Sequence, residues 1–487
     1  MDEHVKQRTL FVVTASAILV AGCLLAFTHW RSMMSSPTIL AGMIGAEIIV
    51  MALFSYRRAF LWVVFLTFLL AGSSVPARSA FAMARWPVLA MASALGVAIV
   101  SRRTRTMAFD GFHLASLFVV GGLVASSVFS VNPTESLLKA LGYAGLVIFS
   151  ATGARLNWLQ GEARFARALV LAAELLVCVS AVSYGIFSHS LYGNPNSLGA
   201  LMGVFAVPVL TWAVLTPQLG PRLRPTLALV LAGALLISSV ARASWIGVFL
   251  AVVLVLISAR RYAPLVVGVV LLLTTILGLF FYAPSKVAFL QSEVIYKENR
   301  GESGTGMLQS REGPWQESIQ SIRRHPWTGI GFGVTENTAS FEGKFQSEVG
   351  RREHGSSYLA WLEGTGIIGS GILLFWLAHL FANIWRTATL VRRNRSLFYL
   401  AVPSAMIALA ILAHATFEDS LVAPGYYVTV LFWIMSSCLN DSVSAARETA
   451  KEVRRTSLLQ AGRRVGTAGV PSPSYSMGHT ARDTGQR

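Results

Sequence analysis

Two arginines and one histidine are the residues of this chain whose types and surroundings favour chemistry. Arg242 stands between two apolar runs in "SSVARASWIG", Arg311 lies in "QSREGPW", and His354 precedes an apolar stretch in "RREHGSSYLAWLEGTGIIG". Arginine can hydrogen-bond a phosphate through two N–H groups at once, and an imidazole can accept or donate a proton. Together the three residues favour an anion site with one proton-transfer group. Taken singly, an exposed loop arginine and an interfacial histidine anchor are the simpler interpretations of Arg311 and His354.

The motifs of several other chemistries do not occur in the sequence. No group of His, Cys and Asp residues has the spacing of metal ligands, and neither G-x-x-x-x-G-K-[ST] nor G-x-S-x-G is found. We therefore expect neither a metal nor a cofactor. A phosphate site with one proton acceptor fits transfer from a lipid-linked diphosphate, whose leaving group needs positive charge and whose acceptor hydroxyl needs a base.

The composition indicates which elements position these residues. Hydrophobic residues make up 54% of the 487 residues and charged residues only 13%, whereas soluble chains carry roughly a quarter charged residues. The sequence predicts an all-α polytopic membrane protein with about 12–14 transmembrane helices, because its apolar runs have the length that crosses a bilayer. The predicted spans are 9–28, 37–55, 59–75, 79–100, 113–130, 137–153, 165–187, 197–215, 224–241, 244–258, 263–282, 357–385, 397–416 and 424–440.

The arginines predict the orientation of these spans. They gather in alternate connections, for example at 57–58, 102–105 and 155–167, while the short connections between carry few basic residues. Because basic residues concentrate in cytoplasmic loops, both termini are predicted to be cytoplasmic and the three candidate residues external. The net charge of +17 then reflects topology, and no nucleic-acid partner is expected.

Four regions follow from this pattern. We expect an N-terminal transmembrane bundle over 1–282, a long external loop over 283–356, C-terminal transmembrane helices over 357–440 and a disordered basic cytoplasmic tail over 441–487. A loop of this length is usually functional.

The external loop contains one predicted helix, in "GPWQESIQSIRRHP". Trp315, Ile319 and Ile322 share one helical face, Pro314 suits the first turn, and Pro326 ends the helix. We predict that this amphipathic helix lies on the outer membrane surface.

Other residues on the external side could contact a substrate. Asn194 and Asn196 flank Pro195 in "YGNPNSLGA", which is equally typical of a turn and a helix cap. Glu418 and Asp419 in "FEDSLVAPG" could bind an acceptor sugar or be solvated. Glu363 lies about two helical turns beyond His354, too deep to share its hydroxyl contact if the helix is regular. The candidate substrate contacts are Asn194, Asn196, Lys139, Tyr358, Glu363 and Trp315.

Four motifs in order resemble the O-antigen ligase and polymerase superfamily of bacterial envelope glycosyltransferases. They are the N-P-N-x-L turn from Asn194, "ARASW" around Arg242, the stretch from Arg311 through "HPWTGIGFG", and "HGSSYLAWLEGTGIIG" from His354. Ala241 replaces a serine of the family pattern, and Gly355 replaces an asparagine. The resemblance covers residues 192–369.

This resemblance implies an inverting, metal-independent glycosyltransferase in the bacterial inner membrane, with its active site on the periplasmic face. It implies transfer from a polyprenyl-diphosphate-linked oligosaccharide to a hydroxyl of an acceptor glycan or glycolipid. Arg242 and Arg311 would hold the diphosphate, and His354 would activate or orient the acceptor hydroxyl. Polymerisation of a polysaccharide is favoured over ligation to lipid A core. The expected partners are these substrates, the lipid bilayer and other polysaccharide-assembly proteins.

Two other classes of protein stay open. A transporter, either a lipid-oligosaccharide flippase or a small-anion carrier, would line a pathway with Glu47, Glu174 and Arg85. Against it, we find no internal repeat, and the notable residues gather on one face. A non-catalytic assembly protein would use the long loop as a docking surface. Replacing His354 by alanine discriminates these classes, because only the enzyme should lose function while inserting normally.

Overall fold

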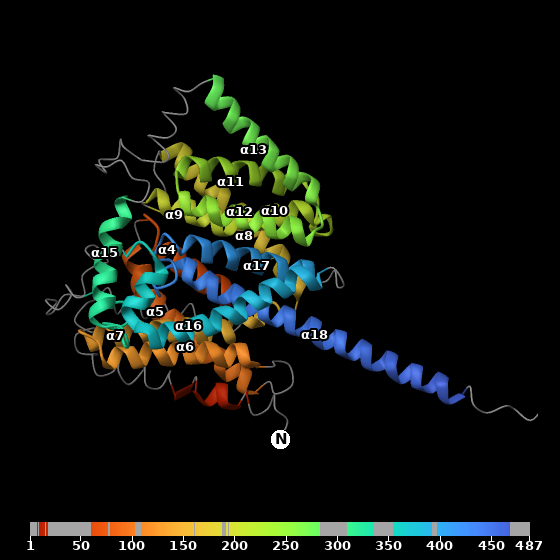
Figure 1. Ribbon diagram of the computed structural model, residues 1–487, viewed down its shortest axis with the longest axis horizontal. Coiled ribbons are helices and arrows are strands. Elements are labelled where there is room, and N and C mark those ends of the chain that lie inside the picture. Colours follow the sequence, from red (N-terminus) through yellow and green to blue (C-terminus); the bar gives the residue numbers. More distant parts are fainter. Residues whose placement is uncertain are drawn as a thin grey trace, which may run out of the picture. The chain divides into compact units, whose positions relative to one another are not determined.

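The structure of the chain is a computed structural model. It describes residues 7, 9–14, 16–17, 60–75, 78–102, 109–159, 161–187, 191–192, 194–282, 309–335, 354–391 and 397–467. Within these residues the regular secondary structure is helical (Figure 1). The helices that form the bundle are α4 (Phe60–Ala71), α5 (Arg78–Arg102), α6 (Gly111–Val128), α7 (Pro133–Ala151), α8 (Glu162–Phe187), α9 (Pro195–Leu201), α10 (Val207–Leu215), α11 (Leu223–Ser239), α12 (Arg242–Ser258), α13 (Tyr262–Tyr282), α16 (Ser357–Leu390), α17 (Leu397–His414) and the first part of α18 (Tyr427–Thr467).

These helices confirm the prediction of an all-α polytopic membrane protein. Eight described helices are long and apolar enough to cross a membrane, and α4, α11 and α12 are shorter apolar helices. Each predicted span from 59–75 onward coincides with a helix, α9 and α10 being joined by one π-helical turn over Met202–Ala206. The predicted span 37–55 and most of 9–28 lie outside the described residues.

The exposed faces of the helices are apolar, which is the arrangement expected for contact with lipid. In α8, Leu171, Leu175, Val179 and Val182 are exposed, while Leu169 and its neighbours on the opposite face are buried. Residues at i, i+4, i+8 and i+11 form one stripe of a helix. Since water would not favour such a stripe, α8 presents this face to the bilayer.

The connections alternate between two ends of the bundle. The C-terminal ends of α4, α6, α8, α11 and α17 lie at one end, hereafter the His354 end. The C-terminal ends of α5, α7, α10, α12 and α16 lie at the other, hereafter the Arg155 end. The closest helix pairs include α12 with α17, α6 with α16, and α4 with α5. Among the arginines that the structure describes, Arg102, Arg155, Arg222 and Arg261 lie at the Arg155 end.

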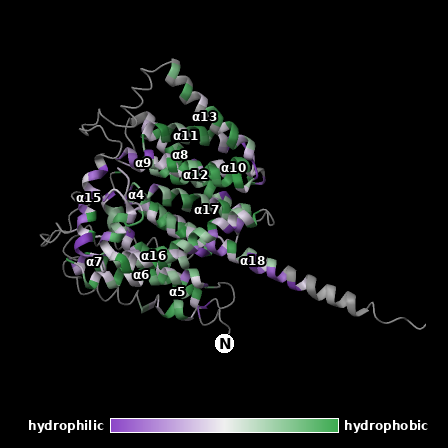
Figure 2. Cartoon of the chain, viewed as in Figure 1, coloured by the Kyte–Doolittle hydropathy of each residue, from purple (hydrophilic) through white to green (hydrophobic). Residues whose placement is uncertain are grey.

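One further helix, α15 (Gln309–Arg324), packs against α16 at the His354 end (Figure 1). It is largely hydrophilic, whereas hydrophobic residues dominate the bundle helices (Figure 2). The helix ends before Pro326 as expected, but the prediction that Pro314 lies in its first turn is wrong. The helix begins five residues before Pro314, at Gln309. Glu312 in the first turn complements the helix dipole, and a proline this close to the N-terminus removes only one hydrogen bond.

The apolar face predicted for α15 is only partly covered. Ser318 and Ser321 are buried, Trp315 and Ile322 are half-buried, and Ile319 is exposed. Small serine side chains on the buried face allow α15 to approach its neighbours closely, and the exposed isoleucine remains available to a membrane surface.

The chain after the last span differs from the expected disordered tail. Helix α18 continues to Thr467, so residues 441–467 are helical. The first compact unit ends at Val443 and the second begins at Ser444. Alanine, arginine, glutamate and lysine, which dominate 445–455, are all strong helix formers, and this explains the continuation.

Candidate functional site

His354 lies in the non-helical segment just before α16, and its imidazole stands between two carboxylates. Its Nε2 is 3.4 Å from Glu363 Oε2, and its Nδ1 is 3.5 Å from Asp419 Oδ2. Its backbone N–H also donates to Asp419 Oδ2 at 2.8 Å. The His354 side chain is 12% exposed, Glu363 1% and Asp419 24%. The histidine is therefore held from a buried side by Glu363 and from a more open side by Asp419.

The contact between His354 and Glu363 corrects the expectation that Glu363 lies too deep. That expectation assumed a regular helix running from His354 itself. The structure starts α16 only at Ser357, after an extended Ser356. Because the segment before the helix folds over its first turns, the imidazole reaches a carboxylate on the second turn.

Asp419 is positioned by the turn between α17 and α18, residues 415–426. Ser357 anchors this turn: its backbone N–H donates to Ala415 O at 2.9 Å, and its hydroxyl donates to Glu418 O at 2.6 Å. The Leu421 N–H in turn donates to Ser357 Oγ at 3.0 Å. The start of α16 and the 415–426 turn thus form one hydrogen-bonded unit. The sequence placed Glu418 and Asp419 on this side of the protein but did not pair Asp419 with His354.

Arg311 and Trp315 of α15 also reach this unit. Arg311 Nη2 donates to Glu418 Oε1 at 2.6 Å, and Trp315 Nε1 donates to Gly355 O at 3.2 Å. Gly355 has φ +66°, and a Cβ there would lie 2.7 Å from Arg311 Cδ. A residue without a side chain is therefore what allows Arg311 to pass directly beside the residue that follows His354. This accounts for the glycine at a position where the resembling family carries asparagine.

The "TGIGFG" stretch supports Glu363 through the backbone of α16. Helix α16 is broken at Gly366, which has φ 63° and ψ −168°. At this break Ile330 N–H donates to Glu363 O and Gly331 N–H to Gly364 O, both at 3.0 Å, while Ile367 N–H donates to Pro326 O at 2.8 Å. A broken helix at membrane depth needs such partners, because lipid offers none to the freed backbone groups.

Lys139 joins the same loop from α7. Its Nζ donates to the carbonyl oxygen of Gly333 and pairs with Glu135 Oε1 at 2.8 Å. The contact with Gly333 ties α7 to the loop that supports Glu363.

The two asparagines have the helix-cap geometry. Asn194 is the N-cap of α9, and its side chain accepts a hydrogen bond from the Asn196 N–H at 2.8 Å. The helix that follows packs against the turn before Arg242, because a Cβ on Gly199 would overlap Ala241. The start of α9 at Asn194 and the turn before Arg242 are therefore adjacent.

Arg242 is the first residue of α12, reached through a two-residue turn in which Val240 has φ 51°. The N-cap Ala241 makes no side-chain cap. A cation at a helix N-terminus is opposed by the helix dipole, so Arg242 is not placed there for helix stability. Arg242 and the α12 N-terminus instead combine two features that favour an anion.

Tyrosines connect the Arg242 side of the site to the Arg311 side. Tyr427 donates to Ser197 O at 2.7 Å, and Tyr426 donates to the Tyr427 hydroxyl at 3.3 Å. Burial raises the pKa of Tyr426 to about 12, with the charge of Glu418 adding to the effect. Tyr358, a predicted substrate contact, donates instead to Leu412 O at 2.9 Å and so holds α16 against α17.

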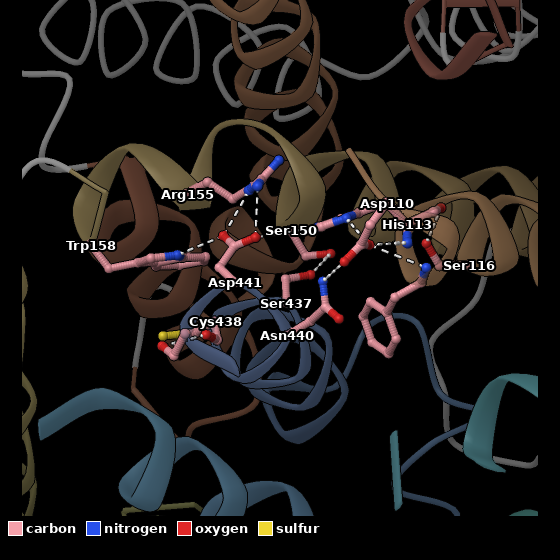
Figure 3. Close-up of polar contacts among 12 residues, drawn as sticks. Asp110, His113, Ser116, Ser150, Arg155, Trp158, Ser437, Cys438, Asn440 and Asp441 are labelled. Atoms are coloured by element: carbon pink, nitrogen blue, oxygen red, sulfur yellow. Dashed lines mark hydrogen bonds and ion pairs between the residues drawn. The ribbon is translucent and has the colours of Figure 1, made fainter. Parts of the chain in front are cut away.

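A second polar cluster, at the Arg155 end, was not found from the sequence (Figure 3). Arg155 donates to both oxygens of Asp441, at 2.8 and 2.6 Å, and Trp158 Nε1 donates to Asp441 Oδ2 at 2.8 Å. His113 Nε2 lies 3.7 Å from the same carboxylate, while its Nδ1 is 2.9 Å from Asp110. His113 lies on α6 and Asp441 on α18, while Arg155 and Trp158 lie in the connection between α7 and α8.

The cluster continues into α16. Asn440 donates to Asp110 Oδ2 at 2.9 Å, and Asn383 donates to Asn440 Oδ1 at 2.9 Å. We interpret this cluster as a cross-link between helices. Asp441 was assigned to the disordered tail because it follows an apolar run, yet it is buried in the bundle.

The residues named for a transport pathway also have partners within the protein. Glu174 pairs with Arg224 at 2.9 Å, and Arg85 donates to Gly425 O at 3.0 Å. Glu47 lies outside the described residues. The two described contacts support helix packing.

The fold and the site define a multi-pass membrane protein with arginines, a histidine and carboxylates gathered at one end of its bundle. Residues 227–375 match the family described as O-Antigen ligase. The match confirms the resemblance to the O-antigen ligase and polymerase superfamily and supports an enzyme of that type. It includes Arg242, Arg311, His354 and Glu363, whereas Lys139, Asn194 and Asp419 lie outside it. No curated protein matches the chain.

Proposed function

We propose that the protein transfers a glycan from a polyprenyl-diphosphate carrier to an acceptor sugar hydroxyl at the His354 end. The observation that carries this proposal is the position of His354. It stands between Glu363 and Asp419 and directly precedes the glycine that Arg311 passes. One site thus combines a proton acceptor with a cation suited to phosphate.

The diphosphate of the carrier would be held by Arg311 and Arg242. Departure of a glycan leaves negative charge on the diphosphate, and preorganised positive groups stabilise that charge in the transition state. Arg311 supplies a guanidinium from α15, and Arg242 supplies another beside the N-terminus of α12. The contacts through Ser197, Tyr427 and Tyr426 hold these two sides of the site together.

The acceptor hydroxyl would approach His354 from the side of Asp419. Glu363 is the more deeply buried carboxylate, so it is suited to hold Nε2–H and fix the orientation of the ring. Nδ1 then receives the hydroxyl proton as the hydroxyl oxygen attacks the anomeric carbon and the bond to the diphosphate breaks. Asp419 stabilises the resulting imidazolium. Attack opposite the leaving diphosphate inverts the anomeric configuration.

The site would face the periplasm, with both termini in the cytoplasm of a bacterial inner-membrane protein. The support is the alternation of arginine-rich connections along the sequence, together with described arginines such as Arg155, Arg222 and Arg261 at the Arg155 end. The positive-inside rule assigns that side to the cytoplasm. At the periplasmic side a lipid-linked diphosphate supplies the energy of transfer without ATP.

Transfer is tested with the purified full-length protein in phosphatidylcholine nanodiscs. A polyprenyl-diphosphate-linked oligosaccharide is added, and the products are separated on a gel. We expect a ladder of longer glycans, as polymerisation predicts. Product formed only when a lipid A core is added would instead identify a ligase, and no product with either acceptor would refute the proposed reaction.

The role of His354 is tested by His354→Ala, with His379→Ala farther along α16 as the matched control. Loss of a general base costs about 10²–10⁴-fold in rate, so we expect a loss of this size for His354→Ala and near-normal activity for the control. Glu363→Gln should lower the turnover rate more than it changes KM for the donor, because it acts on the ring and not on the diphosphate.

A further inference from the structure

The guanidinium that would bind the diphosphate already has an internal partner. Arg311 Nη2 lies 2.6 Å from Glu418 Oε1, and the two side chains are 18% and 23% exposed. They come from elements far apart in the sequence, α15 and the 415–426 turn. A carboxylate and a phosphate oxygen bind a guanidinium in the same way, so the carboxylate of Glu418 occupies the position that an incoming phosphate needs.

The backbone of Glu418 is held independently of this ion pair. Its carbonyl oxygen accepts hydrogen bonds from the hydroxyl and the N–H of Ser357, at 2.6 and 3.2 Å. The next residue, Asp419, accepts the N–H of His354. The Glu418 side chain can therefore rotate away from Arg311 while the turn that positions Asp419 stays in place.

A tyrosine hydroxyl lies near the Glu418 carboxylate, although it donates to the Tyr427 hydroxyl and not to Glu418. The charge of Glu418 is among the causes that raise the pKa of Tyr426, so the two groups lie within electrostatic range. Tyr426 belongs to the same 415–426 turn, and it is only half-buried.

We propose that Glu418 is an internal competitor of the lipid diphosphate: it pairs with Arg311 in the empty site, is displaced by the donor, and returns as the diphosphate product leaves. The inference rests on the proposed function, which assigns Arg311 to the diphosphate. A diphosphate displaces Glu418 because it carries more charge than a carboxylate and, under the proposed function, also binds Arg242. Donor and product both carry the diphosphate, so the return of Glu418 to Arg311 also favours release of the product.

Glu418→Gln tests the proposal, with Glu312→Gln as the matched control. Glu312 is an exposed carboxylate next to Arg311 in sequence, so its replacement makes the same change in net charge without removing the internal pair. Binding of inorganic pyrophosphate to the full-length protein in phosphatidylcholine nanodiscs is measured by calorimetry. We expect Glu418→Gln to bind about tenfold more tightly than wild type, since a charged partner is replaced by a neutral one, and Glu312→Gln to stay within about twofold.

The enzymatic consequence is measured in the transfer assay. Glu418→Gln should be inhibited by farnesyl diphosphate, a short analogue of the product, at about tenfold lower concentration than wild type. Glu418→Asp keeps the charge but shortens the side chain. If Glu418→Gln inserts poorly into the membrane, Glu418→Asp replaces it in the binding measurement. Glu418→Asp is also expected to bind pyrophosphate more tightly than wild type.

The outcomes separate this inference from the proposed function. If wild type binds pyrophosphate and loses it on Arg311→Ala, but Glu418→Gln binds no more tightly than Glu312→Gln, the competitor role is overturned and the pair is structural. If wild type and Arg311→Ala bind pyrophosphate equally or not at all, the assignment of Arg311 to the diphosphate fails, and the inference fails with it.

Discussion

The break in α16 gives the sharpest test of how the site is built, through the substitution Gly366→Ala. Gly366 has φ 63° and ψ −168°, a region of backbone conformation that is essentially restricted to glycine. A Cβ at this position would also overlap the carbonyl oxygen of Trp327. The substitution therefore strains α16 and pushes the 326–331 loop away from it.

The magnitude follows from the contacts at the break. The backbone conformation costs about 1–3 kcal/mol for a residue other than glycine. Four hydrogen bonds cross the break, from the N–H groups of Ile330, Gly331, Ile367 and Ile368, and each contributes about 0.5–1.5 kcal/mol. Loss of all four together with the strain gives a destabilisation of about 3–9 kcal/mol. Activity should fall as well, because the loop supports the residue that contacts His354.

Chemical unfolding in mixed micelles measures the loss of stability, and the transfer assay measures the loss of activity. Gly371→Ala is the matched control: it lies on the same helix, and a Cβ added there would meet no atom within 4 Å. We expect the control to change stability by at most about 1 kcal/mol. A Gly366→Ala variant as stable and as active as Gly371→Ala would refute the argument that the break is maintained by the loop.

Three further predictions concern stability. Arg155→Ala should cost about 3–5 kcal/mol of unfolding free energy, because it leaves Asp441 buried without its main partner. Arg261→Ala, at an exposed arginine of the same end, should cost under about 1 kcal/mol in the same assay. Equal effects of the two substitutions would contradict the role of the Arg155–Asp441 pair as a cross-link between helices. Asn194→Ala should cost about 1 kcal/mol as a lost helix cap and Asn194→Ser should restore it; activity that does not return with serine would indicate a substrate contact instead. Burial raises the pKa of Tyr426 from 10.0 to about 12, so the unfolded chain loses this proton at a lower pH than the folded protein does. Wild type should therefore lose stability between pH 10 and 12 more steeply than Tyr426→Phe. Parallel curves of stability against pH would argue against a buried Tyr426 hydroxyl.

The sequence predicted the helices well because membrane burial leaves a simple signal. A span needs a long apolar run, and the alternating arginines mark which connections share an end. The helix start at Gln309 and the helical residues after Asp441 were missed for the same reason. Both segments are polar, so no apolar run marks their bounds, and helix propensity alone decides them.

The candidate site was predictable in its residue types but not in its pairings. Arg311 and His354 could be singled out because charged or titratable groups near apolar runs are unusual. Their partners, Glu418 and Asp419, come from a turn about 65 residues farther along the chain from His354, and only the packing of α16 against α17 brings them close. Gly355 also carried no signal by itself, because its role depends on the approach of α15.

The two glycine-rich stretches of the sequence act as one structural unit, and this bears on the chemistry. A carboxylate 1% exposed within a membrane bundle is costly unless it has a polar partner. His354 is one such partner of Glu363, and it reaches Glu363 because the segment before α16 folds over the helix. The 326–331 loop in turn holds the backbone of Glu363 at the break. The glycines of "GIGFG" and "EGTGIIG" are therefore required together: the first allows the loop to approach, the second allows the helix to break, and the proton acceptor of the proposed reaction depends on both.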